Sequence, residues 1–170
     1  LITVVGQAGI GKTAFALSAA HHWRPHWVDG AAWVELAAIA DPELVVSMVA
    51  QGLGLSSGGQ DPLQALVAAL KPLQVLLVID NAEHVLDAVA KLVQAVLAGA
   101  PNVRILVTSQ LPLRLPAERV FRLGPLSVPD QGVTVDEAMQ HGAVALFVDQ
   151  VKAINRYFEL SQAQLDRVIG

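Results

Sequence analysis

"GQAGIGKT", residues 6–13, separates the apolar run LITVV from the helix-like segment TAFALSAA. Its glycine spacing, with Lys12 and Thr13 at the end, matches the phosphate-loop pattern G-x-x-x-x-G-K-[ST]. Glycines let such a loop wrap closely around an anion, so that successive backbone N–H groups and the start of the following helix face phosphate oxygens. A glycine-rich turn that only caps a helix is the alternative. The complete motif between a strand and a helix favours a nucleotide site.

Five short runs rich in valine, isoleucine and leucine have the composition of buried strands. They cover residues 1–5, 31–36, 74–80, 103–109 and 119–123. Most of the segments between them have helical patterns, such as residues 82–98, where apolar positions recur at helical spacing before Gly99. Strands that are apolar on both faces and alternate with helices predict a parallel sheet covered on both sides. We therefore expect a three-layer α/β fold with a five-stranded parallel sheet.

Polar residues at fixed spacings mark the starts of several helices. Each of two Asp-Pro pairs places an N-cap acceptor before a proline whose missing N–H costs nothing in the first turn. Each of two capping boxes pairs a hydroxyl with an acid or amide three residues later. The pairs are Asp41-Pro42 and Asp61-Pro62, and the boxes are Thr134-x-x-Glu137 and Ser161-x-x-Gln164, with residues 143–148 expected inside the helix that the first box starts. We expect a nucleotide-binding core over residues 1–125 and the start of a truncated helical segment over 126–170.

An aspartate ends the third predicted strand. Asp80 closes the run QVLLVID, and ligands gather at the carboxyl ends of parallel strands. Its carboxylate and the hydroxyl of Thr13 are therefore expected to hold Mg²⁺, directly or through water. A helix-capping aspartate is the alternative. The phosphate loop in the same chain favours the metal role.

Two neighbours of Asp80 bear on whether the site hydrolyses nucleotide. Asn81 cannot act as a base, and it is placed to cap a helix that begins at Ala82. Glu83 is the nearest acid that can take a proton. An acid in the first turn of a helix is equally well explained by the helix dipole. Glu83 is thus the candidate catalytic residue, with a purely structural role as its alternative.

Several stretches of the chain together resemble one family. GQAGIGKT, LLVIDNAEHVLDA, VRILVTSQLPLRLPAERVFRLGPL and AVALFV occur in this order, and the strand AAWVEL lies between the phosphate-loop strand and the Asp80 strand. This arrangement resembles the ASCE division of P-loop NTPases and, within it, the STAND class of signalling ATPases. The likeness is to the NB-ARC-like domain of bacterial LuxR-type and SARP-type transcriptional regulators, and it covers nearly the whole chain. It implies a P-loop domain that binds ATP or ADP with Mg²⁺.

The loop motif and the resemblance together assign the residues that contact nucleotide. They are Gly6, Gly9, Ile10, Gly11, Lys12, Thr13, Asp80 and Gln110. In the family, the strand after the Asp80 strand ends in Thr-Ser-Arg, whose arginine senses the terminal phosphate, whereas here VTSQ places Gln110 at that position. A neutral amide brings no charge, and a charge-assisted hydrogen bond is about twice as strong as a neutral one. The family also carries a Gly-x-Pro motif in the helical segment after the P-loop core, and residues 126–170 contain no such motif. The family's helix-turn-helix and repeat domains are absent from the sequence as well.

Composition limits the partners that the chain can have. Its 11 basic and 15 acidic residues give a net charge of −4, which is the wrong sign for nucleic acid, so we expect no direct DNA binding. The absence of cysteine excludes disulfides and thiolate metal sites. The longest uncharged stretch, residues 44–60, has fewer than the roughly 18 apolar residues that suggest a membrane span. We expect a soluble, cytoplasmic protein whose partners are nucleotide and other domains of a longer chain.

Two histidines offer a metal site as a further possibility. His22 and His26 lie four residues apart, which is a metal-ligand spacing when both are on one helix. Pro25 argues against a continuous helix there. The alternative is a helix-ending loop in which Trp23 and Trp27 pack on the core.

Two other enzyme classes use the same phosphate loop. A small-molecule kinase would use Arg114, Arg119 and Arg122 as a lid on the transferred phosphate, and it needs an acceptor pocket and a base that the sequence does not identify. An AAA-type motor would need a hexamer and an arginine supplied by a neighbour. Because no N-K-x-D guanine motif occurs, adenine is the expected base in every case.

The amide at position 81 suits a site that holds nucleotide for a long time and uses its identity as a signal. A ligand that drives a switch from 1:99 to 99:1 must prefer one state by about ten-thousand-fold. Contacts that distinguish ATP from ADP therefore matter more than turnover. The sequence predicts an ATP/ADP-binding signalling switch domain of a larger regulatory ATPase, with slow hydrolysis.

Overall fold

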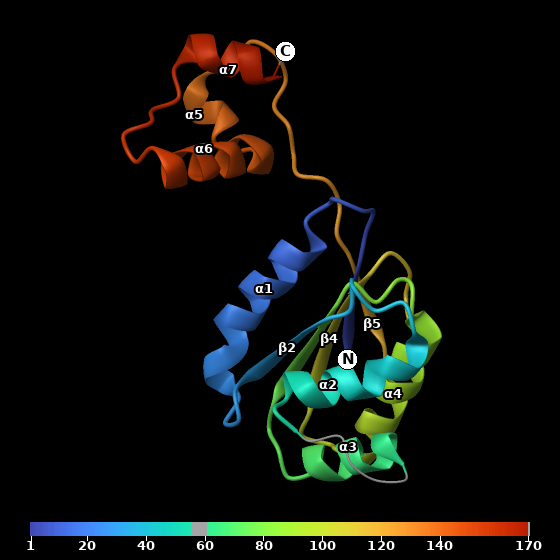
Figure 1. The fold of residues 1–170 in the computed structure, drawn as a ribbon. Helices are drawn as coiled ribbons and strands as arrows, with labels where there is room; N and C mark the ends of the chain where they lie inside the picture. Colours follow the sequence, from blue (N-terminus) through green and yellow to red (C-terminus); the bar gives the residue numbers. More distant parts are fainter. Residues whose placement is uncertain (56–60, 170) are drawn as a thin grey trace. The chain divides into compact units, whose positions relative to one another are not determined.

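The computed structural model describes residues 1–55 and 61–169, and the chain divides into two compact units, Leu1–Leu123 and Gly124–Gly170. The first unit is built on a sheet of five strands. These are β1 (Ile2–Val5), β2 (Ala31–Glu35), β3 (Leu76–Asp80), β4 (Arg104–Ser109) and β5 (Arg119–Arg122). The strand order is β2-β3-β4-β1-β5, and every neighbouring pair is parallel. The predicted five-stranded parallel sheet is confirmed (Figure 1).

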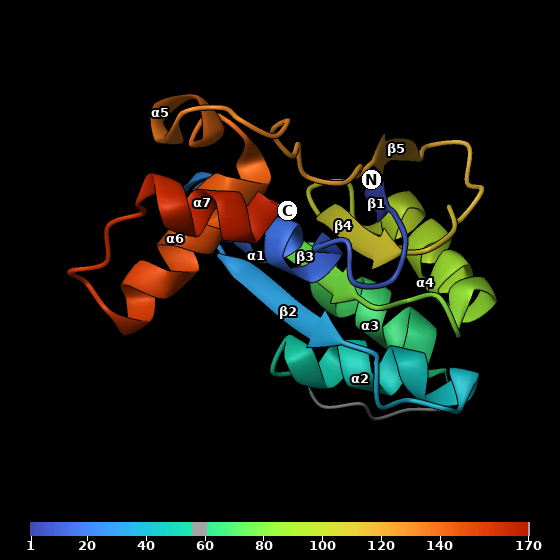
Figure 2. The ribbon, with the colours of Figure 1, turned by 90° about the horizontal axis from the view of Figure 1, so that it is seen from above.

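Helices cover the sheet on both faces, which confirms the predicted three layers. α1 (Lys12–Trp23) covers one face, while α2 (Val45–Gly52), α3 (Pro62–Leu70) and α4 (Leu86–Gly99) lie on the other, as the view in Figure 2 shows. Successive side chains of a strand point to opposite faces. Accordingly Leu76 and Val78 of β3 join the core under α1, and Leu77 and Ile79 join the larger core under the other helices.

The helix starts at the two Asp-Pro pairs form as predicted. The Asp61 carboxylate accepts from the backbone N–H groups of Leu63 and Gln64 at 3.1 Å each, at the start of α3. The Asp41 carboxylate accepts from the Glu43 N–H at 2.9 Å. That cap begins a short 3-10 helix, Pro42–Leu44, which leads directly into α2.

The expectation that residues 119–123 form a buried strand is wrong in one respect. β5 forms and pairs with β1, but all four of its residues are exposed. The reason is its position at the end of the strand order, where it pairs with β1 alone. Phe121 remains 45% exposed and stacks on Phe15 of α1, with ring centroids 5.0 Å apart.

The second unit is a small cluster of helices, α5 (Val135–Ala138), α6 (Gly142–Ile154) and α7 (Gln162–Ile169). Its core consists of Ala138, Val144, Val148 and Leu165. The capping box at Thr134 forms, but the helix that it begins ends after one turn. At Ser161 only half of the predicted box forms, because the Gln164 side chain accepts from the Ser161 N–H while the Ser161 hydroxyl donates to the same side chain. Residues 143–148 therefore belong to the next helix, α6, which corrects the sequence-based expectation. Among the described residues, no helix has both the length and the apolar character needed to cross a bilayer.

Candidate nucleotide site

The glycine-rich loop joins β1 to α1 at the carboxyl edge of the sheet. Gly11 is the N-cap of α1 and has a φ of 99°, in the left-handed region that disfavours other residues. Gly6 is required for space: a Cβ there would lie 2.8 Å from Cγ2 of Ile10 and 3.0 Å from the carbonyl oxygen of Leu123. Ile10 thus closes over the start of the loop. Gly9, the other glycine of the loop that was predicted to contact nucleotide, is exposed.

Lys12 turns back onto the loop that precedes it. Its side chain is only 8% exposed, and Nζ donates to the carbonyl oxygens of Gly6 and Gln7 at 3.0 Å each. A buried ammonium group needs such acceptors, because leaving it without hydrogen bonds is costly. The loop therefore carries a positive charge inside its own curve, where phosphate oxygens would be stronger acceptors than backbone carbonyls.

Asp80 is a buried acid that accepts hydrogen bonds from two hydroxyl groups. The carboxylate is 2% exposed and accepts from the Thr13 hydroxyl, whose Oγ1 lies 3.1 Å from Oδ1 and 2.9 Å from Oδ2. The hydroxyl of Thr108 donates to Oδ1 at 2.5 Å and itself accepts from the Asn81 N–H at 2.9 Å. Asp80, Thr13 and Thr108 come from β3, α1 and β4, so the fold alone brings them together.

These groups fit a nucleotide with its magnesium ion. Mg²⁺ takes oxygen ligands and is usually held by one or two carboxylates together with substrate phosphates. Thr13 and Asp80 provide a hydroxyl and a carboxylate within hydrogen-bond distance of each other, at the start of the helix that follows the phosphate loop. In the part of the chain that the structure describes, no group of three or more histidines and acids gathers in a way that would suit a metal bound by protein alone.

The residues after Asp80 do not form the helix turn that the sequence suggested. α4 begins at Leu86, with Val85 as its N-cap and no side-chain cap. Asn81 therefore caps no helix, and Glu83 is not a first-turn acid, so both structural alternatives are wrong. Asn81 instead has a φ of 63°, a left-handed conformation that asparagine tolerates better than most residues. The chain is thereby redirected between β3 and α4.

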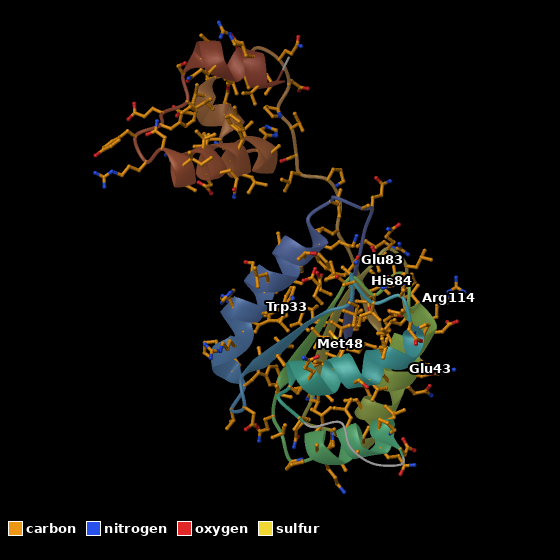
Figure 3. All side chains as sticks on the ribbon, in the orientation of Figure 1. Trp33, Glu43, Met48, Glu83, His84 and Arg114 are labelled. Atoms are coloured by element: carbon orange, nitrogen blue, oxygen red, sulfur yellow. The ribbon has the colours of Figure 1, made fainter. Side chains whose placement is uncertain are left out.

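Asn81 and Gln110 both reach Glu83. With its amide oriented so that the nitrogen faces Glu83, Asn81 donates to Oε1 at 2.8 Å and to Oε2 at 3.1 Å. Gln110, immediately after β4, donates from Nε2 to Oε1 at 3.3 Å. The two amides that distinguish this sequence thus meet at one carboxylate. Figure 3 shows Glu83 and the neighbouring His84 at this end of the sheet.

Among the described residues, none of the arginines proposed as a lid donates a hydrogen bond to the Glu83 carboxylate. Arg114 is exposed, has a φ of 59°, and appears at the outer edge of the sheet unit in Figure 3. Its backbone is held by Glu118, whose carboxylate accepts from the N–H groups of Leu113 and Arg114 at 2.8 Å each. Arg119 and Arg122 are the exposed ends of β5.

The histidine pair is separated by a change of helix type. α1 ends at Trp23, and a 3-10 helix, Arg24–His26, begins with Pro25 in its first turn. The ring of His26 contacts the carbonyl oxygen of Trp23 at 3.2 Å through Nδ1. Trp27 packs against the core under α1, whereas Trp23 stays 36% exposed, so only one of the two tryptophans packs as expected.

Thr108 is the site residue that the sequence analysis missed. It stands in the same VTSQ stretch as Gln110 and two residues before it. Because the carboxyl ends of neighbouring parallel strands meet at one edge, a polar residue near the end of β4 is close to Asp80. Attention to strand order would have found it, but the sequence does not state that β3 and β4 are neighbours.

Several known proteins are similar to this chain. Residues 1–107 match the family model described as an AAA domain. A candidate HTH-type transcriptional regulator of Mycobacterium tuberculosis is 31% identical over 162 residues, which are 95% of this chain and 17% of that protein. The regulatory protein AfsR of Streptomyces griseus is 32% identical over 117 residues, which are 64% of this chain and 12% of that protein. The chain therefore spans a small part of the length of these relatives.

A solved structure shares the fold at low sequence identity. It is a signal transduction ATPase with numerous domains, a STAND protein with a tetratricopeptide repeat sensor, from Pyrococcus horikoshii. The match has a TM-score of 0.57 and 14% identity, and it covers 98% of this chain and 24% of that one. At this identity, the likeness extends to the fold alone.

Proposed function

Because this chain belongs to the AAA-domain family of P-loop ATPases, we propose that it is the ATP- and ADP-binding switch domain of a larger regulatory protein, with slow hydrolysis. It is related to domains of candidate HTH-type transcriptional regulators. The observation that carries the proposal is the cluster of Lys12, Thr13 and Asp80 at the glycine-rich loop. It combines a positive charge, a hydroxyl and a carboxylate where phosphates and Mg²⁺ would bind.

The loop residues and two residues from neighbouring strands would hold the nucleotide. They are Gly6, Gly9, Ile10, Gly11, Lys12, Thr13, Asp80 and Gln110. Lys12 would exchange its two carbonyl acceptors for phosphate oxygens, and Thr13 and Asp80 would hold Mg²⁺. The ion, when bound, would supply positive charge to the phosphates. Gln110 would report on the terminal phosphate with a neutral amide.

The proposed switch function rests on two groups that the site lacks, a base directly after Asp80 and a positive charge at position 110. Asn81 cannot take a proton, and Gln110 brings no charge. An arginine at the terminal phosphate is worth about 10³ to 10⁵ in rate in switch GTPases. Without it, nucleotide would remain bound long enough for its identity to serve as the signal. The base of any hydrolysis must then be sought among the acids of this edge, and Glu83 is the sequence-based candidate.

The output of the switch would lie in other domains. The matching relatives are much longer than this chain. The matched region makes up 17% of the M. tuberculosis regulator and 12% of AfsR. With a net charge of −4, the domain itself is expected not to bind DNA. A mobility shift of duplex DNA at low salt would contradict this division of labour.

Two measurements on the unmodified chain test the proposal. Calorimetry with Mg²⁺ should show binding of both ATP and ADP, and single-turnover hydrolysis should run at about 10⁻⁴ to 10⁻³ per second, as in an unassisted switch GTPase. Absence of binding refutes the site. A turnover near the enzyme median of about 10 per second refutes the switch, and it would favour the small-molecule kinase or the AAA-type motor.

A further inference from the structure

Glu35 ends β2 beside Asp80. The two strands are parallel, and the register pairs Glu35 directly with Asp80. The next backbone hydrogen bond continues this pairing, since the Leu36 N–H donates to the Asp80 carbonyl oxygen at 2.9 Å. Neighbouring strands lie about 4.8 Å apart. The backbones at the bases of the two acidic side chains are therefore adjacent.

Both acids project to the face of the sheet that α1 covers. Side chains alternate between faces along a strand. Ala31 and Trp33 of β2 pack in the core under α1, so Glu35 shares their face. Leu76 and Val78 place Asp80 on the same face by the same rule, as does its hydrogen bond to Thr13 of α1. Figure 3 shows Trp33 on this side, next to α1.

The surroundings of Glu35 differ from those of the other two acids. Asp80 is buried and bonded to two hydroxyls, and Glu83 accepts from two amides. Glu35 is exposed, and no side chain in residues 1–55 and 61–169 donates to its carboxylate. Of these three acids, it is the only one in the exposed class. It also carries one more methylene than Asp80, so it reaches farther from the sheet edge.

We propose that Glu35, rather than Glu83, is the general base for hydrolysis at this site, an inference that rests on the proposed nucleotide-binding function. The oxygen of a water molecule bonds to the terminal phosphorus, and the bond from that phosphorus to the bridging oxygen breaks. ADP leaves with the electron pair of that bond. The proton of the water passes to the Glu35 carboxylate, which releases it to solvent after the phosphate departs.

A base at Glu35 is compatible with slow turnover. General base catalysis contributes about 10² to 10⁴ in rate, whereas the charge absent at Gln110 is worth about 10³ to 10⁵ in related chemistry. The rate lost with the missing charge is therefore larger than the rate gained from the base. Glu35 therefore accounts for residual hydrolysis in a domain whose sequence places an amide directly after Asp80.

Three matched substitutions test the assignment. Glu35→Gln should lower the single-turnover rate at least about a hundredfold, while the calorimetric Kd for ATP with Mg²⁺ changes less than about threefold, because no binding contact is removed. Glu83→Gln should change the rate less than about threefold. Glu43→Gln, an exposed glutamate of the 3-10 helix before α2, is the control for loss of one charge. Thermal unfolding should be the same for all three variants.

The possible outcomes separate this inference from the function on which it rests. If the unmodified chain binds no ATP, the proposed function itself fails. If it binds ATP but Glu35→Gln hydrolyses at the unmodified rate, only the base assignment fails. If the unmodified chain binds ATP but does not hydrolyse it above the buffer rate, the base assignment and the slow hydrolysis of the proposed function both fail, while the nucleotide site stands. A Kd weakened more than about tenfold in Glu35→Gln would show a role in holding the ion, and it would also overturn the assignment.

Discussion

The two ends of the nucleotide site are bonded in different ways. At the phosphate-loop end, a buried cation and a buried carboxylate are held separately: Lys12 donates to the carbonyl oxygens of Gly6 and Gln7, and Asp80 accepts from Thr13. At the sensing end, defined by Asn81, Glu83 and Gln110, two neutral amides meet one partly exposed carboxylate.

The difference separates holding a nucleotide from distinguishing one nucleotide from another. Hydrogen bonds to charged groups contribute about 1.5–3 kcal/mol each and neutral ones about 1 kcal/mol. The phosphate-loop end can therefore supply most of the affinity for either nucleotide. The sensing end alone can favour ATP over ADP, and only by a modest amount. We expect substitutions at the first end to have large effects on binding and those at the second to have small ones.

The largest effect is expected at Lys12. Lys12→Ala removes the positive charge from the loop and should weaken ATP binding by about 1.5 to 3 kcal/mol, roughly 10- to 150-fold, as measured by calorimetry. Lys71→Ala, which removes an exposed lysine at the end of α3, is the matched control and should leave the Kd unchanged. Equal affinities for the two variants would show that the charge of Lys12 does not contribute to ATP binding.

A nearly equal effect, on stability instead of binding, is expected at Thr108. Thr108→Val removes a hydroxyl that donates to buried Asp80 and accepts from the Asn81 N–H, so both partners lose a hydrogen bond. We expect the free energy of unfolding to fall by about 1 to 3 kcal/mol in urea denaturation.

Thr3 provides the matched control for that substitution. It is fully buried on β1, and its hydroxyl has no hydrogen-bond partner in the described part of the chain. Thr3→Val exchanges an unpaired hydroxyl for a methyl group and should leave stability unchanged or raise it by about 1 kcal/mol. If Thr108→Val and Thr3→Val lost equal amounts of unfolding free energy, the hydrogen bonds of Thr108 would contribute no stability of their own.

A smaller effect is expected at Gln110. Gln110→Arg supplies the charge that the sensing end lacks, and it should increase the preference for ATP over ADP by about 1 kcal/mol, roughly fivefold, in paired calorimetric titrations. Glu83 competes for the new charge, because it already contacts residue 110. The double variant Gln110→Arg with Glu83→Gln removes this competitor and should show the larger preference. No gain in either variant would place position 110 away from the terminal phosphate.

The smallest effect is expected at Asn81. If this side chain faced the attacking water, Asn81→Asp would add a base and accelerate hydrolysis. Its amide contacts Glu83 instead, so a carboxylate there would meet a like charge. We expect the single-turnover rate of Asn81→Asp to stay within about twofold of the unmodified chain. An increase of tenfold or more would show that the residue reaches the water.

The sequence by itself determined the parts of the molecule that depend on neighbours along the chain. The alternation of apolar runs with helical segments gave the layered α/β fold, because side-chain periodicity decides which faces are buried. The loop spacing placed Lys12 and Thr13 at the start of a helix, and the Asp61-Pro62 pair gave the start of α3. Each of these depends on residues only a few positions apart.

Local patterns failed where the backbone departs from regular geometry. The apolar spacing of residues 82–98 predicted a helix from Ala82, but the left-handed conformation of Asn81 delays α4 until Leu86. The composition of residues 119–123 predicted a buried strand, but strand order put β5 at an edge. Neither the conformation of one residue nor the order of strands is encoded in side-chain periodicity.

Tertiary structure alone decided which polar groups share the site. Thr108 meets Asp80 because β4 lies beside β3, and Gln110 meets Glu83 because both follow the carboxyl ends of these neighbouring strands. Glu35 stands next to Asp80 because the register of β2 on β3 pairs them, 45 positions apart in sequence. A shift of that register by one residue would turn Glu35 to the opposite face from Asp80, since side chains alternate with a period of two. Pairing between distant strands is fixed by packing of the whole sheet, and no short stretch of the sequence contains it.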